Sequence, residues 1–437
     1  MINFRSQGFK RYFLNTSWMI SERLVRIVVA FLVGVYVARY LGPERFGLIS
    51  YALSFIALFS AVATLGLDQI VIRKLVENEE TKTKILGTAF TLKIAGSLAL
   101  LSVIFISVQL ISTDNYTKFL ITILALGIFF QSFNVIDFYF ESLVIAKFSS
   151  WAKFGAMFAS SMLKLWLIHI HASLLWFAWA FVFENAILAV LLVIFYTTKK
   201  SKIHWWRFEK KLAFKFLHDS WPLIISSLAI MVYMRIDQVM IKAILDNKSV
   251  GNYAVAVKLS EAFYFIPLAI SSSLFPAIIK LKQENNRLYL AGLQKLYDLM
   301  TWLGISIALP TTIFADHIVR FLFGQNYLPA ADVLKIHIWA CVFVFLGIAC
   351  GKWFIAENLQ KYSLYRTLSG AILNIILNLV LIPIFGIRGA AFSTVVSYFS
   401  AAYLSMAFFK HSRKNFWLAT KSFNIFAAPI RIFNIND

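Results

Sequence analysis

The sequence predicts an all-α membrane protein of about twelve transmembrane helices, arranged as two pseudo-symmetric six-helix bundles around a central cavity. Three observations lead to this fold class. Of the 437 residues, 60% are hydrophobic and only 14% are charged, whereas an ordinary soluble domain is about 25% charged. Apolar stretches long enough to cross a bilayer, roughly 20 residues each, recur along the whole chain. Positive charges gather in alternate connections, as they do in polytopic membrane proteins.

Apolar stretches bounded by charges or turn residues give the position of each span. Because these spans fill the chain, the connections are short and no separate extramembrane domain is expected. Twelve spans fit best, within a range of eleven to fourteen. The expected spans are residues 15–40, 46–67, 85–109, 118–146, 151–170, 174–197, 217–244, 250–279, 293–315, 328–352, 362–385 and 388–410.

The distribution of lysine and arginine tests the order of these spans. On one side of the predicted membrane the connections and termini carry 28 of these residues, and on the other side they carry 7. Cytoplasmic loops are enriched in positive charge, so both termini are expected in the cytoplasm. Trp18 and Trp221 lie at proposed cytoplasmic helix ends, which agrees because indole rings prefer the membrane interface.

The two halves of the chain resemble each other weakly. Trp18 and Trp221 open the first and seventh spans, and Gly47 and Gly251 begin the second and eighth, at offsets of 203 and 204 residues. Six spans per half is an even number, so the repeats are expected to run parallel about an axis along the membrane normal. The expected parts are an N-terminal six-helix lobe at 1–197, a basic cytoplasmic linker at 198–216, a C-terminal six-helix lobe at 217–410 and a basic cytoplasmic tail at 411–437.

Soluble enzyme chemistry and nucleic-acid binding have no support in the sequence. The net charge of +21 is carried by short connections and not by the basic face of a folded domain, so nucleic acid is not an expected partner. Cys341 and Cys350 lie in one apolar span without metal-ligand spacing. No phosphate-binding loop, dinucleotide fingerprint or nucleophile elbow is present. We therefore expect no enzymatic activity, no cofactor and no metal.

Four segments carry a resemblance to a known family. The first half contains ARYLGPERFGLISYALSF (Ala38 to Phe55) and TLGLDQIVIRKL (Thr64 to Leu75); the second half contains RIDQVMI (Arg235 to Ile241) and VGNYAVAVKLSEAFYFIP (Val250 to Pro267). Together they resemble bacterial O-antigen and polysaccharide flippases of the multidrug/oligosaccharidyl-lipid/polysaccharide exporter superfamily. The similarity extends over most of the chain in order and spacing.

This resemblance implies a MATE-like exporter fold and a flippase function. The substrate would be an undecaprenyl-pyrophosphate-linked oligosaccharide, an O-antigen or other polysaccharide repeat unit for lipopolysaccharide or related biosynthesis. It would move from the inner to the outer leaflet of the bacterial cytoplasmic (inner) membrane by alternating access, coupled to a gradient of protons or sodium as in an antiporter. Membrane lipid, a polysaccharide polymerase and a chain-length regulator are the implied partners.

Ionisable residues within the spans are the candidate site, since each costs about 2.5 to 3.5 kcal/mol at the bilayer centre and normally faces a partner helix or a watery cavity. A pyrophosphate requires cations, and a glycan requires amide or aromatic groups. The candidate substrate-binding residues are Arg26, Lys93, Arg235, Lys258, Lys335, Asn374 and Asn378. The candidate ion-coupling residues are Glu22, Asp137, Glu141, Asp237 and Glu261.

Helical spacing predicts some pairings among these residues. Asp137 and Glu141 are one turn apart and share a face, and Lys258 lies three residues from Glu261. Asp237 lies two residues from Arg235 and so cannot easily share its face, which makes Arg235 the expected freer cation. For each group the alternative is an interhelical ion pair that only holds the bundle together.

Two other functions remain as alternatives. A multidrug or cation exporter of the same fold would differ in the chemistry of its cavity, and the seven Lys and Arg within the spans favour an anionic substrate instead. A membrane polysaccharide polymerase would require a large external loop to order its substrates around acid and base groups. The longest expected external connection is short, near residues 315–329.

Overall fold

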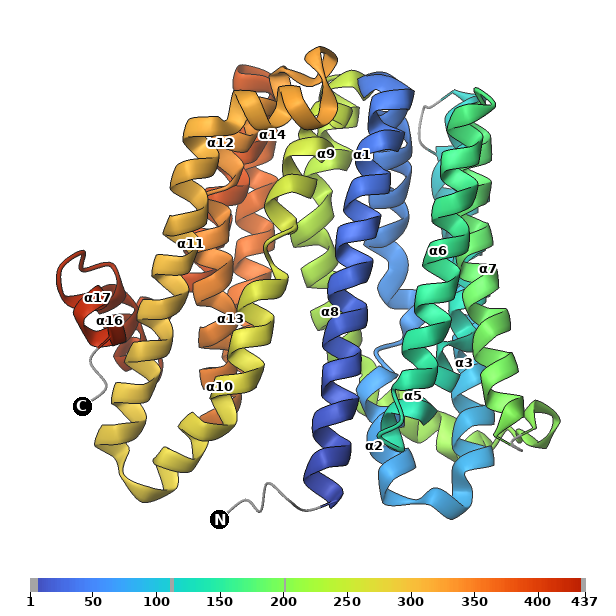
Figure 1. Ribbon diagram of the computed structural model, residues 1–437, viewed down its shortest axis with the longest axis horizontal. Helices are drawn as coiled ribbons and strands as arrows, with labels where there is room; N and C mark the ends of the chain where they lie inside the picture. Colours follow the sequence, from blue (N-terminus) through green and yellow to red (C-terminus); the bar gives the residue numbers. More distant parts are fainter. Residues whose placement is uncertain (1–6, 111–113, 200–201, 434–437) are drawn as a thin grey trace. The chain divides into compact units, whose positions relative to one another are not determined.

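The computed structural model describes residues 7–110, 114–199 and 202–433, and these residues form helices without any strand (Figure 1). The predicted all-α fold class is therefore confirmed. In the first half the helices are α1 (Gln7–Thr64), α2 (Asp68–Glu77), α3 (Lys82–Leu110), α4 (Asn115–Phe130), α5 (Val135–Ser142), α6 (Lys147–His169) and α7 (Leu174–Thr198). In the second half they are α8 (Lys210–Ile244), α9 (Asn247–Glu261), α10 (Phe265–Glu284), α11 (Asn286–Phe323), α12 (Pro329–His337), α13 (Ala340–Ala356), α14 (Gln360–Phe399), α15 (Ser405–Phe408), α16 (Arg413–Ser422) and α17 (Ala427–Phe433).

Nine helical segments in the described part of the chain are long and apolar enough to cross a membrane. Two of them, Glu22–Glu77 and Lys361–Phe408, are much longer than one crossing requires. Each contains a glycine with positive φ, Gly42 at 70° and Gly386 at 60°, where one helix ends and the next begins. The break at Gly42 falls between the first two predicted spans, and the number twelve stays a prediction.

The described chain forms two compact units. Unit 1 contains residues 1–41 and 51–231, and unit 2 contains residues 42–50 and 232–437. The boundaries between the units therefore lie within α1 and α8. The lobes expected at 1–197 and 217–410 stay a prediction.

Unit 1 is built on buried apolar side chains of α2, α3, α5 and α7, with Leu67, Leu86 and Val135 fully enclosed. The helices α6 and α7 pack along each other, and α4 packs against α7 (Figure 1). The basic linker is anchored to α3, because Glu209 forms an ion pair with Lys84 at 3.0 Å. The described end of the predicted linker therefore contacts α3 within this unit.

In unit 2, α11 is the central helix and contacts α10, α12, α13 and α16. The helices α1 and α9 also meet there, at the two glycines that the internal repeat singles out. A Cβ atom on Gly47 would lie 1.8 Å from the Asn247 carbonyl oxygen, and one on Gly251 would lie 1.9 Å from the Pro43 carbonyl oxygen. Two backbones can approach this closely only where both residues lack a side chain.

The segment predicted as a basic tail is folded. Its helices α16 and α17 pack against α11 (Figure 1). The Tyr297 hydroxyl donates to the Asn415 side chain at 2.6 Å, and the Thr301 and Ser422 hydroxyls lie 2.8 Å apart. Residues 413–433 therefore belong to the packed body of unit 2.

Candidate functional site

Unit 1 contains a pocket of about 510 Å³ that is lined mainly by polar and charged groups. Its walls come from the helices α1 to α7, together with the short turn that joins α4 to α5. Three cations and three carboxylates line it. They are Arg26, Lys93, Lys153, Asp68, Asp137 and Glu141.

Two ion pairs organise these charges. The buried Lys93 Nζ lies 3.2 Å from Asp68 Oδ1 and 4.6 Å from the centre of the Phe138 ring. Lys153 Nζ lies 2.6 Å from Asp137 Oδ2. Pairing offsets part of the cost of placing these charges within membrane-spanning helices.

The carboxylates of α5 are incompletely paired. Asp137 Oδ1 is buried and has no hydrogen-bond partner among the described residues. Glu141, one turn later, lines the same pocket without an ion pair in the described part of the chain. Arg26 on α1 is paired with Glu22, Nε to Oε1 at 2.8 Å, and keeps much of its surface exposed. The site therefore has acceptor capacity left for a proton, a cation or a sugar hydroxyl.

Neutral polar groups complete the wall. Gln131 donates to the Asn185 side chain at 3.3 Å, and the Ser97 and Ser132 hydroxyls lie 3.2 Å apart. Asn134 also faces the pocket. Amides and hydroxyls beside paired charges are suited to hydrogen bonding with glycan hydroxyls.

Unit 2 contains a second polar cluster, centred on the buried Asp237 of α8. Its carboxylate accepts hydrogen bonds from Tyr253 Oη at 2.6 Å, Asn378 Nδ2 at 2.6 Å and Thr394 Oγ1 at 2.5 Å. Asn378 and Thr394 lie on opposite sides of the break at Gly386, so both parts of α14 reach the same carboxylate. No cation pairs with Asp237 among the described residues.

Several buried groups near Asp237 keep unused hydrogen-bonding capacity. Asn378 also donates to Asn374 Oδ1 at 3.2 Å, and both asparagines are fully buried. Asn378 Oδ1, Asn374 Nδ2 and His337 Nδ1 have no hydrogen-bond partner among the described residues. The His337 ring packs edge-on against Tyr253, with ring centroids 6.0 Å apart. A carboxylate among neutral donors, with one unsatisfied amide oxygen beside it, is suited to binding a proton or a small hard cation.

One sequence expectation about cations is wrong. Arg235 is paired with Glu261, Nη2 to Oε2 at 3.1 Å, so it is not the freer cation. The pairing forms across α8 and α9, which helical spacing along a single helix cannot reveal. Lys335, whose role in binding stays a prediction, is partly exposed and paired with Asp316 at 2.8 Å and Asp332 at 3.4 Å. Lys258 lies half-buried on α9.

Sequence reasoning missed several residues that the structure brings to these clusters. Asp68 falls in an expected connection, although it lies in the TLGLDQIVIRKL segment that carries the family resemblance, and Lys153 falls near the start of the span expected at 151–170. Tyr253 and Thr394 are uncharged and give no signal. Arg366, near the start of the span expected at 362–385, lies in α14, donates to the Gly347 carbonyl at 3.1 Å and has no carboxylate partner among the described residues.

The fold is similar to that of known transporters. An inward-facing multidrug resistance MATE family transporter of the MOP superfamily superposes with a TM-score of 0.74 and 14% identity, covering 91% of this chain and 96% of that chain. The lipid II flippase MurJ, in an inward closed conformation, superposes with a TM-score of 0.72 and 14% identity, covering 94% and 90%. The predicted MATE-like architecture is therefore confirmed at the level of the fold.

Sequence relatives extend the comparison. An uncharacterized membrane protein of Methanocaldococcus jannaschii is 23% identical, over 88% of this chain and 81% of its own length. The probable low-salt glycan biosynthesis flippase Agl15 of Haloferax volcanii is 25% identical over 40% of this chain and 37% of its own length. The probable flippase AglR of the same organism is 28% identical over 38% and 36%. The family model for polysaccharide biosynthesis proteins matches residues 36–332, well over half of the chain. This multi-pass membrane protein therefore belongs to the polysaccharide biosynthesis protein family.

Proposed function

We propose that this protein is a flippase that carries a lipid-linked oligosaccharide across the membrane by alternating access. The observation that carries the proposal is the pocket of unit 1, where cations, carboxylates, amides and hydroxyls line one space. Cations bind a pyrophosphate through charge-assisted hydrogen bonds, and the neutral groups suit the hydroxyls of a glycan. The family match and the two flippases among the relatives support the same substrate class.

The family resemblance supplies the finer assignment. The substrate is a polysaccharide repeat unit of the O-antigen type on undecaprenyl pyrophosphate, moved from the inner to the outer leaflet of the cytoplasmic membrane. Both termini then lie in the cytoplasm, and a polymerase and a chain-length regulator act beside the flippase. Lys93 is the cation of the unit 1 pocket that we assign to the pyrophosphate, because it is buried within that pocket.

We assign the coupling ion to the Asp237 cluster. A buried carboxylate held by three neutral donors gains from binding a proton or sodium, because burial penalises the uncompensated charge. Release of that ion to the other side of the membrane would change the hydrogen bonds that join α8, α9 and α14. Asp137 is a second candidate, since one of its oxygens has no partner among the described residues.

Reconstitution in vesicles tests the function. A fluorescent undecaprenyl-pyrophosphate oligosaccharide is placed in one leaflet, and its transfer is followed with and without imposed proton or sodium gradients. We expect transfer that one of the two gradients accelerates. A cationic dye in the same vesicles tests the multidrug-exporter alternative, and transport of the dye without transfer of the lipid would contradict the proposal.

Lys164 provides a matched control for Lys93. It is also a cation within a predicted span, the one at 151–170, but its Nζ is paired with Glu184 Oε2 at 2.9 Å and it does not line the pocket. We expect Lys93→Met to stop transfer and Lys164→Met to leave it largely intact at equal protein abundance. Equal losses in both variants would mean that Lys93 serves only to hold the helices together.

A further inference from the structure

The hairpin of α16 and α17 has its polar and apolar sides inverted relative to a helix that packs on a water-soluble core. On α16, Asn415, Ala419 and Ser422 share one side and are fully buried. Lys414, Trp417 and Lys421 follow the i, i+3, i+7 spacing of the opposite side. The side that faces the protein is small and polar, and the side that faces outward carries an indole ring between two lysines.

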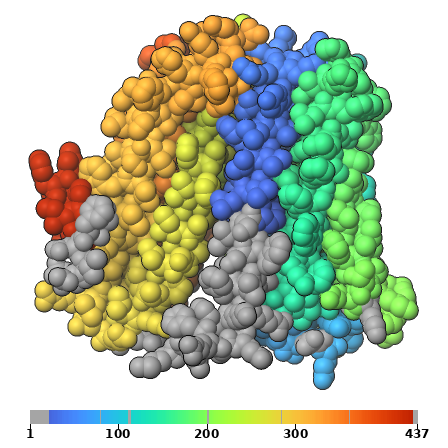
Figure 2. Space-filling model, in the orientation of Figure 1, coloured from blue at the N-terminus to red at the C-terminus, as the bar shows by residue number. Residues whose placement is uncertain are grey.

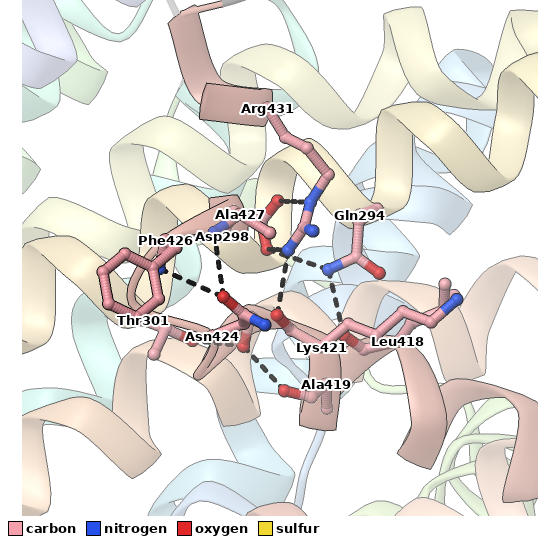
Figure 3. Close-up of polar contacts among 11 residues, drawn as sticks. Gln294, Asp298, Thr301, Leu418, Ala419, Lys421, Asn424, Phe426, Ala427 and Arg431 are labelled. Carbon is pink, nitrogen blue, oxygen red and sulfur yellow. Dashed lines mark hydrogen bonds and ion pairs between the residues drawn. The ribbon is translucent and has the colours of Figure 1, made fainter. Parts of the chain in front are cut away.

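Hydrogen bonds between the hairpin and α11 hold the inner side in place (Figure 3). Arg431 donates to both oxygens of the fully buried Asp298, at 2.7 and 3.0 Å, and to the Lys421 carbonyl at 2.9 Å. Gln294 donates to the Leu418 carbonyl at 3.0 Å. Because this bidentate pair joins the end of the hairpin to α11, the orientation of the outer side is fixed.

The outer side exposes large apolar groups. Trp417 is 57% exposed, Ile425 65%, Phe426 83% and Ile430 64%. In Figure 2 the C-terminal residues, coloured red, protrude from the orange and yellow helices of the same unit. Two short helices with polar anchors on one side and aromatic and aliphatic groups on the other match an element that lies in a membrane interface.

Position and charge indicate which surface covers this side. The last candidate span ends at Phe408, shortly before α16 begins at Arg413, so the hairpin starts where the chain leaves the membrane. Residues 411–437 contain the basic residues Arg413, Lys414, Lys421 and Arg431 and a single acidic residue, Asp437. A basic segment beside a span is attracted to anionic lipid headgroups.

We propose that the α16–α17 hairpin is a lipid-docking element that inserts Trp417, Ile425, Phe426 and Ile430 below the headgroups of an anionic leaflet. Lys414 and Lys421 bind the phosphates of that leaflet, and the Asp298–Arg431 pair transmits the position of the leaflet to α11. The hairpin therefore holds one helix of unit 2 at a fixed depth while other helices move. This inference does not depend on the identity of the transported lipid.

Site-specific quenching tests the proposal on the full-length chain. The variant Phe426→Cys is labelled with an environment-sensitive fluorophore, which is selective because Cys341 and Cys350 are buried. Glu80→Cys, an exposed position in the turn after α2, is the matched control. In vesicles of phosphatidylcholine and phosphatidylglycerol, we expect a lipid with a shallow nitroxide to quench the probe at 426 and aqueous iodide to quench the probe at 80.

The charge requirement is measured by placing the nitroxide on either lipid class. We expect phosphatidylglycerol to quench the probe at 426 more strongly than phosphatidylcholine does. Replacing both lysines, in Lys414→Gln/Lys421→Gln, should reduce that preference by up to roughly fivefold per lysine, because each basic residue contributes about 1 kcal/mol near an anionic surface. Both side chains are exposed, so folding should be unaffected.

Three results would overturn the proposal. Quenching of the probe at 426 by iodide alone would place the hairpin in water. A disulfide formed in high yield between two copies of the unlabelled Phe426→Cys variant would mean that a second copy of the chain covers this side. Equal quenching by both lipid classes, unchanged in the lysine variant, would remove the anionic headgroup from the interaction.

Discussion

Several ionisable residues of the two polar clusters are stabilised by a partner from another helix or by a group of neutral donors. Lys93 reaches Asp68 on α2, Lys153 reaches Asp137 on α5, and Arg235 reaches a carboxylate on α9. Asp237 is held by hydroxyl and amide donors. A charge at the bilayer centre costs about 2.5 to 3.5 kcal/mol, so these contacts decide which charges the fold can tolerate.

The Arg235–Glu261 pair gives a prediction about stability. Both side chains are partly buried, with 29% and 22% of their surface exposed. Removing one partner of a fully buried pair costs about 3 to 5 kcal/mol, so Arg235→Ala should cost about 3 kcal/mol or less. Thermal unfolding of Arg235→Ala, Glu261→Ala and the double variant completes the cycle. We expect the double variant to lose less stability than the two single variants lose together. Strictly additive losses would contradict a direct interaction between the two side chains.

The donors to Asp237 give a second prediction. Tyr253→Phe removes a hydroxyl that lies 2.6 Å from the carboxylate and keeps the ring that packs beside His337. A hydrogen bond to a charged group contributes about 1.5 to 3 kcal/mol, so the midpoint of thermal unfolding should fall. Tyr264→Phe is the control, because that buried hydroxyl has no hydrogen-bond partner among the described residues. Similar shifts in both variants would refute the role given to the Asp237 contact.

The sequence predicts these residues better than it predicts their partners. Asp237, Asn374 and Asn378 stand out as polar groups within apolar spans, and the structure brings all three together. Their neighbours Tyr253 and Thr394 are ordinary residues of membrane helices, and only the packing of α9 and α14 reveals their role. Spacing along one helix does not reveal the ion pair of Glu261 with Arg235, because Arg235 lies on another helix.

At the scale of whole elements, the length of an apolar stretch predicts the spans. It does not predict short helices whose inner faces are polar. The hairpin of α16 and α17 has helices of 10 and 7 residues, and its buried side consists of small and polar residues. Hydrophobic periodicity carries no signal for such an element, so a tail is predicted where the structure has packed helices. The breaks at Gly42 and Gly386, in contrast, lie at or near predicted span boundaries.

The contact of α1 with α9 gives a prediction at the same scale. Gly47→Ala should force the two backbones apart, because the added methyl would lie 1.8 Å from the Asn247 carbonyl oxygen. Overpacking of this kind costs about 1 to 3 kcal/mol or more. Gly292→Ala on α11 is the control, since the nearest atom to its Cβ would be 3.4 Å away. We expect a lower unfolding temperature and slower transport for Gly47→Ala only; a silent Gly47→Ala would contradict the close approach.

At the scale of the whole molecule, composition and charge pattern are sufficient for the fold class, and a few motifs are sufficient for the family. Both predictions follow from properties that are spread along the chain, so a wrong assignment at one position does not change them. The division into units is less predictable. Residues 42–50 belong to unit 2 although they precede most of unit 1, because Gly47 packs against α9. Such a long-range contact leaves no local pattern in the sequence.

The distribution of Lys and Arg, 28 on one side against 7 on the other, predicts the orientation of the chain in the membrane. Single cysteines at Lys202 and Lys414 should be shielded from a membrane-impermeant thiol reagent in intact cells, whereas one at Asn326 should react, since cytoplasmic loops are the basic ones. All three positions are exposed, so shielding cannot result from burial in the protein. The native Cys341 and Cys350 are buried and should give little background. After the cells are permeabilised, all three sites should be labelled. Labelling of Lys202→Cys from outside intact cells would reverse the orientation, and opposite results at Lys202 and Lys414 would mean an odd number of spans between them.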